Sequence, residues 1–148
     1  MWLTEEQQQI WRRYLEMASR LQTAMHRQLL QDCELSLADY DVLVALSERG
    51  PQRINELGEV LAWEQSRLSH QLGRMRGRGL VERHGGGDDR RGATVELTDS
   101  GRAALDAAAP GHAELVRAVV FDGLSAAQLR AFGSTIESVL ERLTSPLR

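Results

Sequence analysis

The chain has 148 residues, of which 42% are hydrophobic and 26% are charged, and its formal net charge is −3. These proportions are typical of a globular domain that can bury its own core, and no apolar run approaches the roughly 18–20 residues of a membrane span. Residues 1–13 lack an apolar signal core, and the single cysteine, Cys33, excludes an internal disulfide and a cysteine-cluster zinc site, so we expect a cytoplasmic protein with no membrane partner.

Residues 4–31 are predicted to form one long helix, because apolar side chains recur at spacings of three or four residues. At about 1.5 Å per residue this helix is roughly 40 Å long, so we expect it to pack against another chain or a second long helix. The apolar stripe consists of Ile10, Tyr14, Met17, Leu21, Met25 and Leu29.

Three shorter helices are predicted next, over residues 37–48, 55–62 and 65–78. Ser36 can cap the first of them, with Asp39 at the third helical position, and Gly50 followed by Pro51 ends it. Glu64 precedes the last of the three, where a carboxylate can cap weakly and favours the positive end of the helix.

A β-hairpin is predicted to follow, with strands over residues 80–83 and 93–97. Residues 85–89 read Gly-Gly-Gly-Asp-Asp, a composition that holds no regular element and indicates a turn. The order of elements is therefore mainly helical with one small hairpin, an α+β winged-helix class.

Helix is predicted to resume at Thr98, and Pro110 either breaks it or kinks it so that it continues to about Phe121. Ser125 and Gln128 can then cap a last helix over residues 126–143. The residues that this helix is expected to bury are Leu129, Phe132, Ile136, Val139 or Leu140, and Leu143.

Positive charge is concentrated in one segment. Between Arg67 and Arg91 there are seven arginines and three acids, a charge of +4, which leaves −7 for the rest of the chain. A basic segment in an acidic chain focuses a phosphate-binding field on one face.

Two short helices followed by a glycine-rich hairpin are typical of a winged helix-turn-helix, in which the second helix enters the major groove of DNA. Leu68, Leu72 and Met75 place one side of the 65–78 helix in the core. The alternative is an ordinary solvated polar face. The opposite side carries the predicted DNA-contacting residues Gln65, Ser66, Arg67, Ser69, His70 and Arg74.

The hairpin tip carries Asp89, Arg90 and Arg91. Arginine suits a narrow minor groove, where negative potential is concentrated, and Asp89 can accept hydrogen bonds from the Arg91 guanidinium and orient it. The alternative is an exposed turn with incidental charges.

The segment from Leu35 to Leu105 resembles the MarR (multiple-antibiotic-resistance regulator) family of bacterial winged-helix regulators. The most specific match is the run from Asp89 to Gly101, which follows the family pattern Asp-x-Arg, three residues, Val-x-Leu-Thr-x-x-Gly. The run from Met75 to Val81 matches the junction between the recognition helix and the wing.

The resemblance implies one domain over residues 1–148, with a winged lobe at 35–98 and dimerisation helices at 1–32 and 99–148. It also implies a homodimer on double-stranded DNA, with Arg91 in the minor groove and Asp89 as its anchor. The operator is then a pseudo-palindrome with half-sites about one helical turn apart, and repression is the usual outcome.

The resemblance further implies a small aromatic effector, bound between the dimerisation helices and the winged lobe. A plain core is the alternative for Tyr14, Met25 and Tyr40. The segments that would line the cleft carry Trp11, Tyr14, Met25, His26, Tyr40 and His112.

Four other functions fit the sequence less well. Cys33 as a peroxide sensor is disfavoured because Asp32 and Glu34 flank it, which favours the unreactive thiol. The four histidines show no ligand spacing on one helix face, and no nucleophile elbow or phosphate loop is present, so neither a metal, a cofactor nor an enzyme is expected. A winged helix that binds only proteins leaves the basic segment unexplained.

Overall fold

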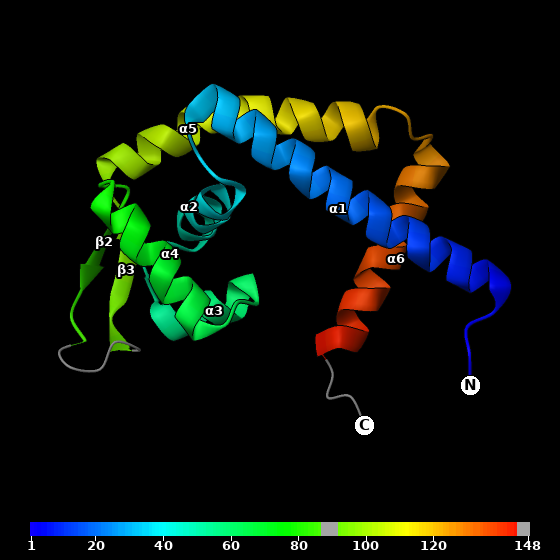
Figure 1. Ribbon diagram of the computed structural model, residues 1–148, viewed down its shortest axis with the longest axis horizontal. Helices are drawn as coiled ribbons and strands as arrows, with labels where there is room; N and C mark the ends of the chain where they lie inside the picture. Colours follow the sequence, from blue (N-terminus) through cyan, green and yellow to red (C-terminus); the bar gives the residue numbers. More distant parts are fainter. Residues whose placement is uncertain (87–91, 145–148) are drawn as a thin grey trace. The chain divides into compact units, whose positions relative to one another are not determined.

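The computed structural model describes residues 1–86 and 92–144, and the chain divides into two compact units, residues 1–112 and 113–148. Within the described residues it is mainly helical, with one small antiparallel sheet, which confirms the predicted winged-helix class (Figure 1). None of the helices in this part of the chain has the length and apolar character needed to cross a membrane.

The long N-terminal helix α1 spans Glu5–Cys33. Thr4 caps it, and Gln7 returns a hydrogen bond to the backbone of Thr4, a reciprocal cap that satisfies two free N–H groups. Burial rises along α1, from Ile10 at 63% exposed to Leu29 at 0%. The helix ends at Glu34, which has a left-handed backbone with φ of 56°.

Helix α2 spans Leu37–Arg49 and begins with the cap expected from the sequence. Ser36 accepts a hydrogen bond from the Asp39 backbone, and the Asp39 carboxylate accepts one from the backbone of Ser36. At the start of α4 the expectation was wrong, because Glu64 makes no capping hydrogen bond with its side chain.

The winged lobe follows, with α3 at Ile54–Leu61, α4 at Gln65–Gly77, β2 at Val81–His84 and β3 at Thr94–Leu97. A two-residue strand, β1 at Gln52–Arg53, completes a sheet of order β1-β3-β2. Strand β1 was not predicted from the sequence, because two residues are too few to show an alternating pattern.

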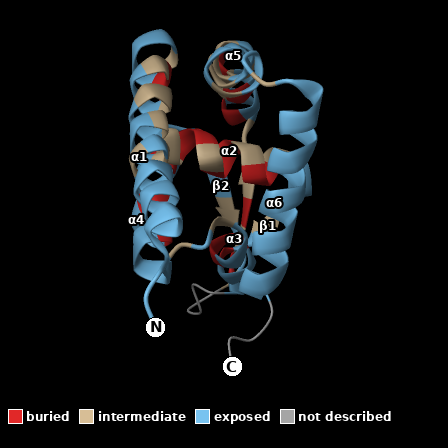
Figure 2. Cartoon of the chain, turned by 90° about the vertical axis from the view of Figure 1, so that its right-hand side faces the viewer, coloured by how far each residue is buried: buried red, intermediate tan, exposed pale blue. Residues whose placement is uncertain are grey.

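The core lies where α2, α3 and α4 pack on one another and on the sheet. Figure 2 shows buried positions in these elements, in α2 above all, and also on α1 and α5. The largest fully buried side chains are Leu29, Leu35, Val42, Leu43, Leu57, Leu68, Met75 and Val95.

The base of the hairpin is tied to the end of α4 by Thr98. Its hydroxyl donates to the Gly79 carbonyl at 2.6 Å and accepts from the Gly101 N–H at 2.9 Å. A Cβ on Gly101 would collide with the Leu80 carbonyl oxygen, so this position needs glycine. The Thr-x-x-Gly motif, Thr98 to Gly101, therefore attaches the base of the wing to the end of α4, and we call it the clasp.

Helix α5 spans Asp99–Val116 and passes through Pro110 without a break, and a π-helical segment, Arg117–Phe121, extends it. Of the two outcomes foreseen at Pro110, the structure shows continuation to Phe121.

Helix α6 spans Ala126–Thr144, and Ser125 and Gln128 form the expected reciprocal cap. In the single chain α6 has no buried residue. Burial of its apolar stripe therefore depends on pairing with a second copy and stays a prediction. Its exposed members are Leu129, Phe132, Ile136, Val139, Leu140 and Leu143.

Candidate nucleic-acid interface

Helix α4 has one buried side and one solvent-exposed side. Leu68, Leu72 and Met75 are 0–7% exposed, as predicted, and they fix which side of the helix faces outward. All the predicted DNA-contacting residues of α4 lie on the solvent-exposed remainder. They are Gln65, Ser66, Arg67, Ser69, His70 and Arg74.

The exposed side of α4 has a central ridge and two flanks, because successive residues of a helix are rotated by about 100°. Ser66, His70 and Gly73 fall on the ridge, opposite the buried residues. The side chains along this ridge are short, so the helix backbone can approach a groove closely.

One flank of α4 is tied to α2 by a buried polar pair. Asp39 and Gln71 are only 6% and 3% exposed, and the Gln71 amide donates to the Asp39 carboxylate at 2.5 Å. The other carboxylate oxygen accepts from Arg78 Nη1 at 3.0 Å. A buried carboxylate is stable only when paired in this way, so these contacts fix α4 against α2.

Arg74 is oriented by the same network. Its Nη2 donates to the Gln71 side-chain carbonyl at 2.8 Å, which leaves the rest of the guanidinium on the surface. Arg78 Nη2 also donates to the Glu34 carbonyl at 2.8 Å, so the network reaches the end of α1. The sequence analysis did not single out Asp39, Gln71 or Arg78 for this role.

Arg67 is held on the same flank by a different contact. Its guanidinium lies 4.3 Å from the centre of the Trp63 ring, a cation–π arrangement. Burial raises the pKa of the nearby Asp41 carboxyl, and the positive charge of Arg67 partly offsets that rise. Trp63 and Asp41 thus limit the directions in which Arg67 can point.

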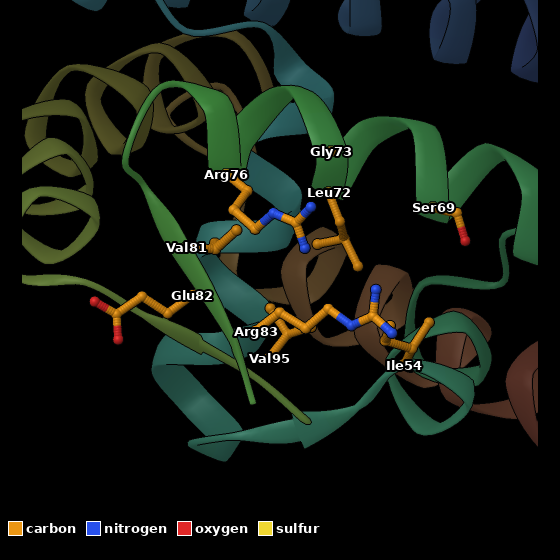
Figure 3. Close-up of a pocket in the computed structure, with 9 residues that line it drawn as sticks. All are labelled: Ile54, Ser69, Leu72, Gly73, Arg76, Val81, Glu82, Arg83 and Val95. Atoms are coloured by element: carbon orange, nitrogen blue, oxygen red, sulfur yellow. The ribbon is translucent and has the colours of Figure 1, made fainter. Parts of the chain in front are cut away.

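The other flank of α4 faces the hairpin across a hollow of about 220 Å³. Its floor is apolar, built from Ile54, Leu72 and Val95, and the side chains of Arg76 and Arg83 extend over it toward the same end (Figure 3). Two guanidinium groups beside an exposed helix face have the charge and geometry to bind phosphate oxygens.

Arg76 and Arg83 were missing from the predicted site, although they belong to the basic segment. Arg76 stands seven residues after Ser69, two helical turns on, which places it on the same flank of α4. Arg83 alternates with Glu82 along β2 and so points toward the α4 side of the sheet. These two spacings are the signal that identifies both arginines.

Asp89, Arg90 and Arg91, the predicted tip of the wing, lie outside the described residues. The strands that lead to them are described, and β2 pairs with β3 in antiparallel register from Val81 opposite Leu97 to His84 opposite Thr94. The assignment of these three residues remains a prediction.

The predicted effector cleft falls into two groups of residues. Trp11 and Tyr14 stack on each other at 5.4 Å on the exposed half of α1, with exposures of 52% and 48%. His26 lies twelve residues beyond Tyr14, which is about 18 Å along the helix axis. Within one chain the two aromatic residues are therefore remote from the rest of the cleft.

The second group lies where α1, α2 and α5 meet. The rings of Tyr40 and His112 are 4.4 Å apart, and His26 Nδ1 accepts from the Leu37 backbone at 3.1 Å. Burial lowers the pKa of His112 and, with the charges of Asp41 and Glu48, raises the pKa of Tyr40. Met25 is partly buried on the same stretch of α1.

Two buried polar atoms in this region lack a partner among the described residues, namely Gln28 Oε1 and His112 Nδ1. A buried acceptor without a donor is unfavourable, so the pair marks a place where an added polar group gains hydrogen bonds. Cys33, the thiol of the redox alternative, is partly buried at the end of α1.

Comparison with known proteins links this geometry to other winged-helix proteins. Residues 35–101 match a family model described as a winged helix DNA-binding domain. The chain is similar to the crystal structure of Sco3205, a MarR family transcriptional regulator from Streptomyces coelicolor in complex with DNA. The two are 38% identical, with a TM-score of 0.90 over 98% of this chain and 92% of that one.

Two further proteins are similar. One structure concerns regulation of DNA binding of Bordetella bronchiseptica BpsR by 6-hydroxynicotinic acid, and it is 26% identical, with a TM-score of 0.73 over 90% of this chain and 97% of that one. The HTH-type transcriptional repressor NicR of Pseudomonas putida is 35% identical over 96 residues, 65% of this chain. That match spans 61% of the length of NicR.

Proposed function

The chain belongs to the MarR family of winged-helix transcriptional regulators, and we propose that it binds a pseudo-palindromic operator as a homodimer and represses transcription. It acts in the cytoplasm on double-stranded DNA, as a regulator and not as an enzyme. A small aromatic effector controls the binding.

The observation that carries this proposal is the arrangement around α4. The exposed side of one helix combines a short central ridge with Arg67 and Arg74 on one flank and Arg76 on the other, beside Arg83 of β2. Such a surface fits a major groove, with base edges facing the ridge and phosphates facing the flanking guanidinium groups.

The dimer proposal is supported by the apolar surface that one chain leaves exposed. Ile10 and Tyr14 on α1 are 63% and 48% exposed, and Phe132 and Ile136 on α6 are 38% and 41% exposed. Exposed apolar stripes of this extent mark protein–protein contacts. We assign residues 1–32 and 99–148 to pairing between two copies and residues 35–98 to DNA.

For the effector we propose the junction of α1, α2 and α5. An aromatic ring can stack on Tyr40 and His112, and a hydroxyl on that ring can donate to Gln28 Oε1, which has no partner among the described residues. Met25 and His26 lie on the adjoining part of α1. Trp11 and Tyr14 reach this site only if the second copy of the chain brings them there.

The proposal is tested with a duplex selected by the wild-type protein from a random pool, with binding followed by fluorescence anisotropy. We expect affinity to fall steeply with salt, because several phosphates are neutralised. Arg91→Ala weakens binding tenfold or more, about 1–3 kcal/mol, without changing the dimer mass. Gln52→Ala, a polar change on β1 away from α4, serves as the matched control.

A selection that enriches no sequence, or a salt response that is flat, contradicts operator binding and favours a protein-interaction module. Unchanged affinity in Arg91→Ala, with a normal salt response, contradicts only the assignment of the wing tip.

A further inference from the structure

Three potential metal ligands meet on the outer face of the hairpin. His84 Nε2 lies 2.7 Å from Glu96 Oε1 and 3.4 Å from Glu82 Oε2, and ligand atoms of all three residues lie within 4.8 Å of one another. Their side chains are 39–55% exposed, so an ion from solvent can reach them. They form the only such group among the residues that the structure describes.

The strand register creates this cluster. Glu82 of β2 stands directly opposite Glu96 of β3, and His84 follows Glu82 by two residues on the same strand. Residues two apart in a strand share a face, so all three project away from Val81 and Val95, which are buried on the other face. The search for ligand spacing along single helices missed the cluster, because its members come from two strands.

The cluster is poorly explained as a device for stability. Like charges directly opposite each other in neighbouring strands are destabilising, and exposed ion pairs contribute little. Among the described residues, the ion pairs of Glu82 and Glu96 are both made with His84. A neutral imidazole can donate only one proton through Nε2, so it cannot satisfy both carboxylates equally well.

We propose that Glu82, His84 and Glu96 form a zinc site on the outer face of the wing. Imidazole and carboxylate are both good zinc ligands, and three protein ligands leave one tetrahedral position for water. Tetrahedral zinc with bonds of about 2.1 Å separates its ligand atoms by about 3.4 Å. The His84–Glu82 distance already has this value, and the His84–Glu96 pair must open by less than 1 Å.

Zinc coordination through Nε2 requires the imidazole tautomer whose proton is on Nδ1, so the Nε2 proton that now contacts Glu96 at 2.7 Å moves through solvent to Nδ1. The ion takes the place of that proton between the nitrogen and the two carboxylates. An oxygen-preferring ion such as magnesium makes little use of the imidazole, so the histidine favours zinc.

The consequence for DNA rests on the proposed function. Without an ion, the wing presents two carboxylates close to the phosphate-binding arginines of β2 and α4. Zinc cancels both negative charges on the strands that lead to the wing tip, so it strengthens attraction to DNA. The site would thus make operator affinity respond to zinc supply.

The test is calorimetric titration of zinc chloride into the full-length, tag-free, metal-free protein without DNA. We expect saturable binding of one ion per chain, at least tenfold weaker in His84→Gln and in Glu96→Gln. His70→Gln and Glu59→Gln are the matched controls, because each removes an exposed group of the same type outside the cluster. A cooperative thermal unfolding transition, measured for each variant, is the check that the variant is folded.

No saturable zinc binding by the wild-type chain overturns the proposal, and so does binding that His84→Gln and Glu96→Gln leave unchanged. In a second measurement, by anisotropy, zinc should tighten binding of the selected duplex several-fold for the wild type and not for His84→Gln. If the calorimetry succeeds while no duplex binds with or without zinc, the zinc site stands and the operator proposal fails.

Discussion

The winged lobe and helix α6 differ in how far they bury their apolar side chains. In the lobe, Leu43, Leu57 and Leu68 are all 0% exposed. On α6, Phe132 and Ile136 are about 40% exposed, although their spacing is as regular as any in the lobe. The lobe therefore supplies most of the buried core, to which Leu29 of α1 and Leu105 of α5 also contribute, whereas α6 leaves its apolar side exposed.

This difference in burial could not be predicted from helical periodicity, which is the same in both regions. A 3.6-residue period shows that a helix has an apolar side, but it does not show whether that side meets the same chain or another. In the lobe, turns and a clasped hairpin bring the covering elements from nearby in the sequence. No described element of the chain buries a residue of α6, so we expect changes on α6 to affect assembly first and changes in the lobe to affect folding first.

The largest expected effect comes from charging the exposed face of α6. Phe132→Asp combined with Ile136→Asp should prevent pairing, because two buried carboxylates without partners oppose an interface. Light scattering should give 16.5 kDa, the mass of one chain. Affinity for the selected duplex should fall at least about a hundredfold, roughly 2.7 kcal/mol, since one chain grips only one half-site.

The matched control is Ser134→Asp combined with Ser138→Asp, which adds the same charge to the opposite side of α6. It should remain a dimer. A dimeric Phe132→Asp/Ile136→Asp protein with full affinity would show that the α6 stripe has another role.

The second largest expected effect is on the stability of the winged lobe. Gly101→Ala places a methyl group against the Leu80 carbonyl, and the backbone must move to relieve the contact. We expect a loss of about 1–3 kcal/mol in the free energy of unfolding, measured by urea denaturation at a fixed chain concentration. Gly73→Ala is the control, because open space surrounds its Cβ position and alanine favours helix by up to about 1 kcal/mol. Equal stability of the two variants would argue against the clasp.

A smaller effect is expected where the lobe meets the DNA surface. Asp39→Asn keeps the shape of the side chain but removes the charge that holds Arg78 and orients Gln71 beneath Arg74. We expect affinity for the selected duplex to fall about fivefold, equivalent to about 1 kcal/mol. If Asp39 acts through Arg74, the effects of Asp39→Asn and Arg74→Ala are not additive in a double-mutant cycle.

Ser36→Ala is the control for that cycle, since it removes the other half of the α2 cap and leaves the Asp39 carboxylate in place. Additive effects of Asp39→Asn and Arg74→Ala would mean that Asp39 serves only the stability of α2.

The smallest effect concerns the junction between the two regions. Burial lowers the pKa of His112 below its ordinary 6.5, so the folded chain holds fewer protons there than the unfolded chain. Stability therefore falls as the pH drops through that ordinary value. Because His112 is only partly buried, we expect less than about 1 kcal/mol, seen as a larger drop in Tm between about pH 7.5 and 5.5 for the wild type than for His112→Gln. Parallel drops in both proteins would contradict this.

Much of the fold followed from local signals in the sequence. Ser36 and Ser125 fixed two helix starts, because each is followed at the third helical position by a residue whose side chain can return a hydrogen bond. Strand β1 could not be foreseen, because its pairing with Val95 and Thr94 depends on residues more than forty positions away. Pro110 left two outcomes open, because the sequence does not show whether a proline ends a helix or lies within it.

Residues of the candidate site were predictable where helical spacing alone determines which side chains are exposed, as for Ser66 and His70 on the ridge of α4. It was not predictable where two elements must meet. Gln71 looks like any polar helical residue until α2 brings Asp39 against it, and Arg83 joins Arg76 only once the hairpin folds back. Side chains of one element can be assigned from spacing, but a contact between elements requires the tertiary structure.

The left-handed residue between α1 and α2 has a mechanical consequence. Helix α1 has 29 residues, so it is a stiff rod of about 43 Å that meets the lobe at Glu34. A rotation of about 10° at that joint displaces the far end of the helix by about 8 Å. Arg78, at the end of α4, donates a hydrogen bond to the Glu34 carbonyl. A small change of direction at Glu34 would therefore displace the N-terminal end of α1 by a much larger distance and would be felt at the end of α4.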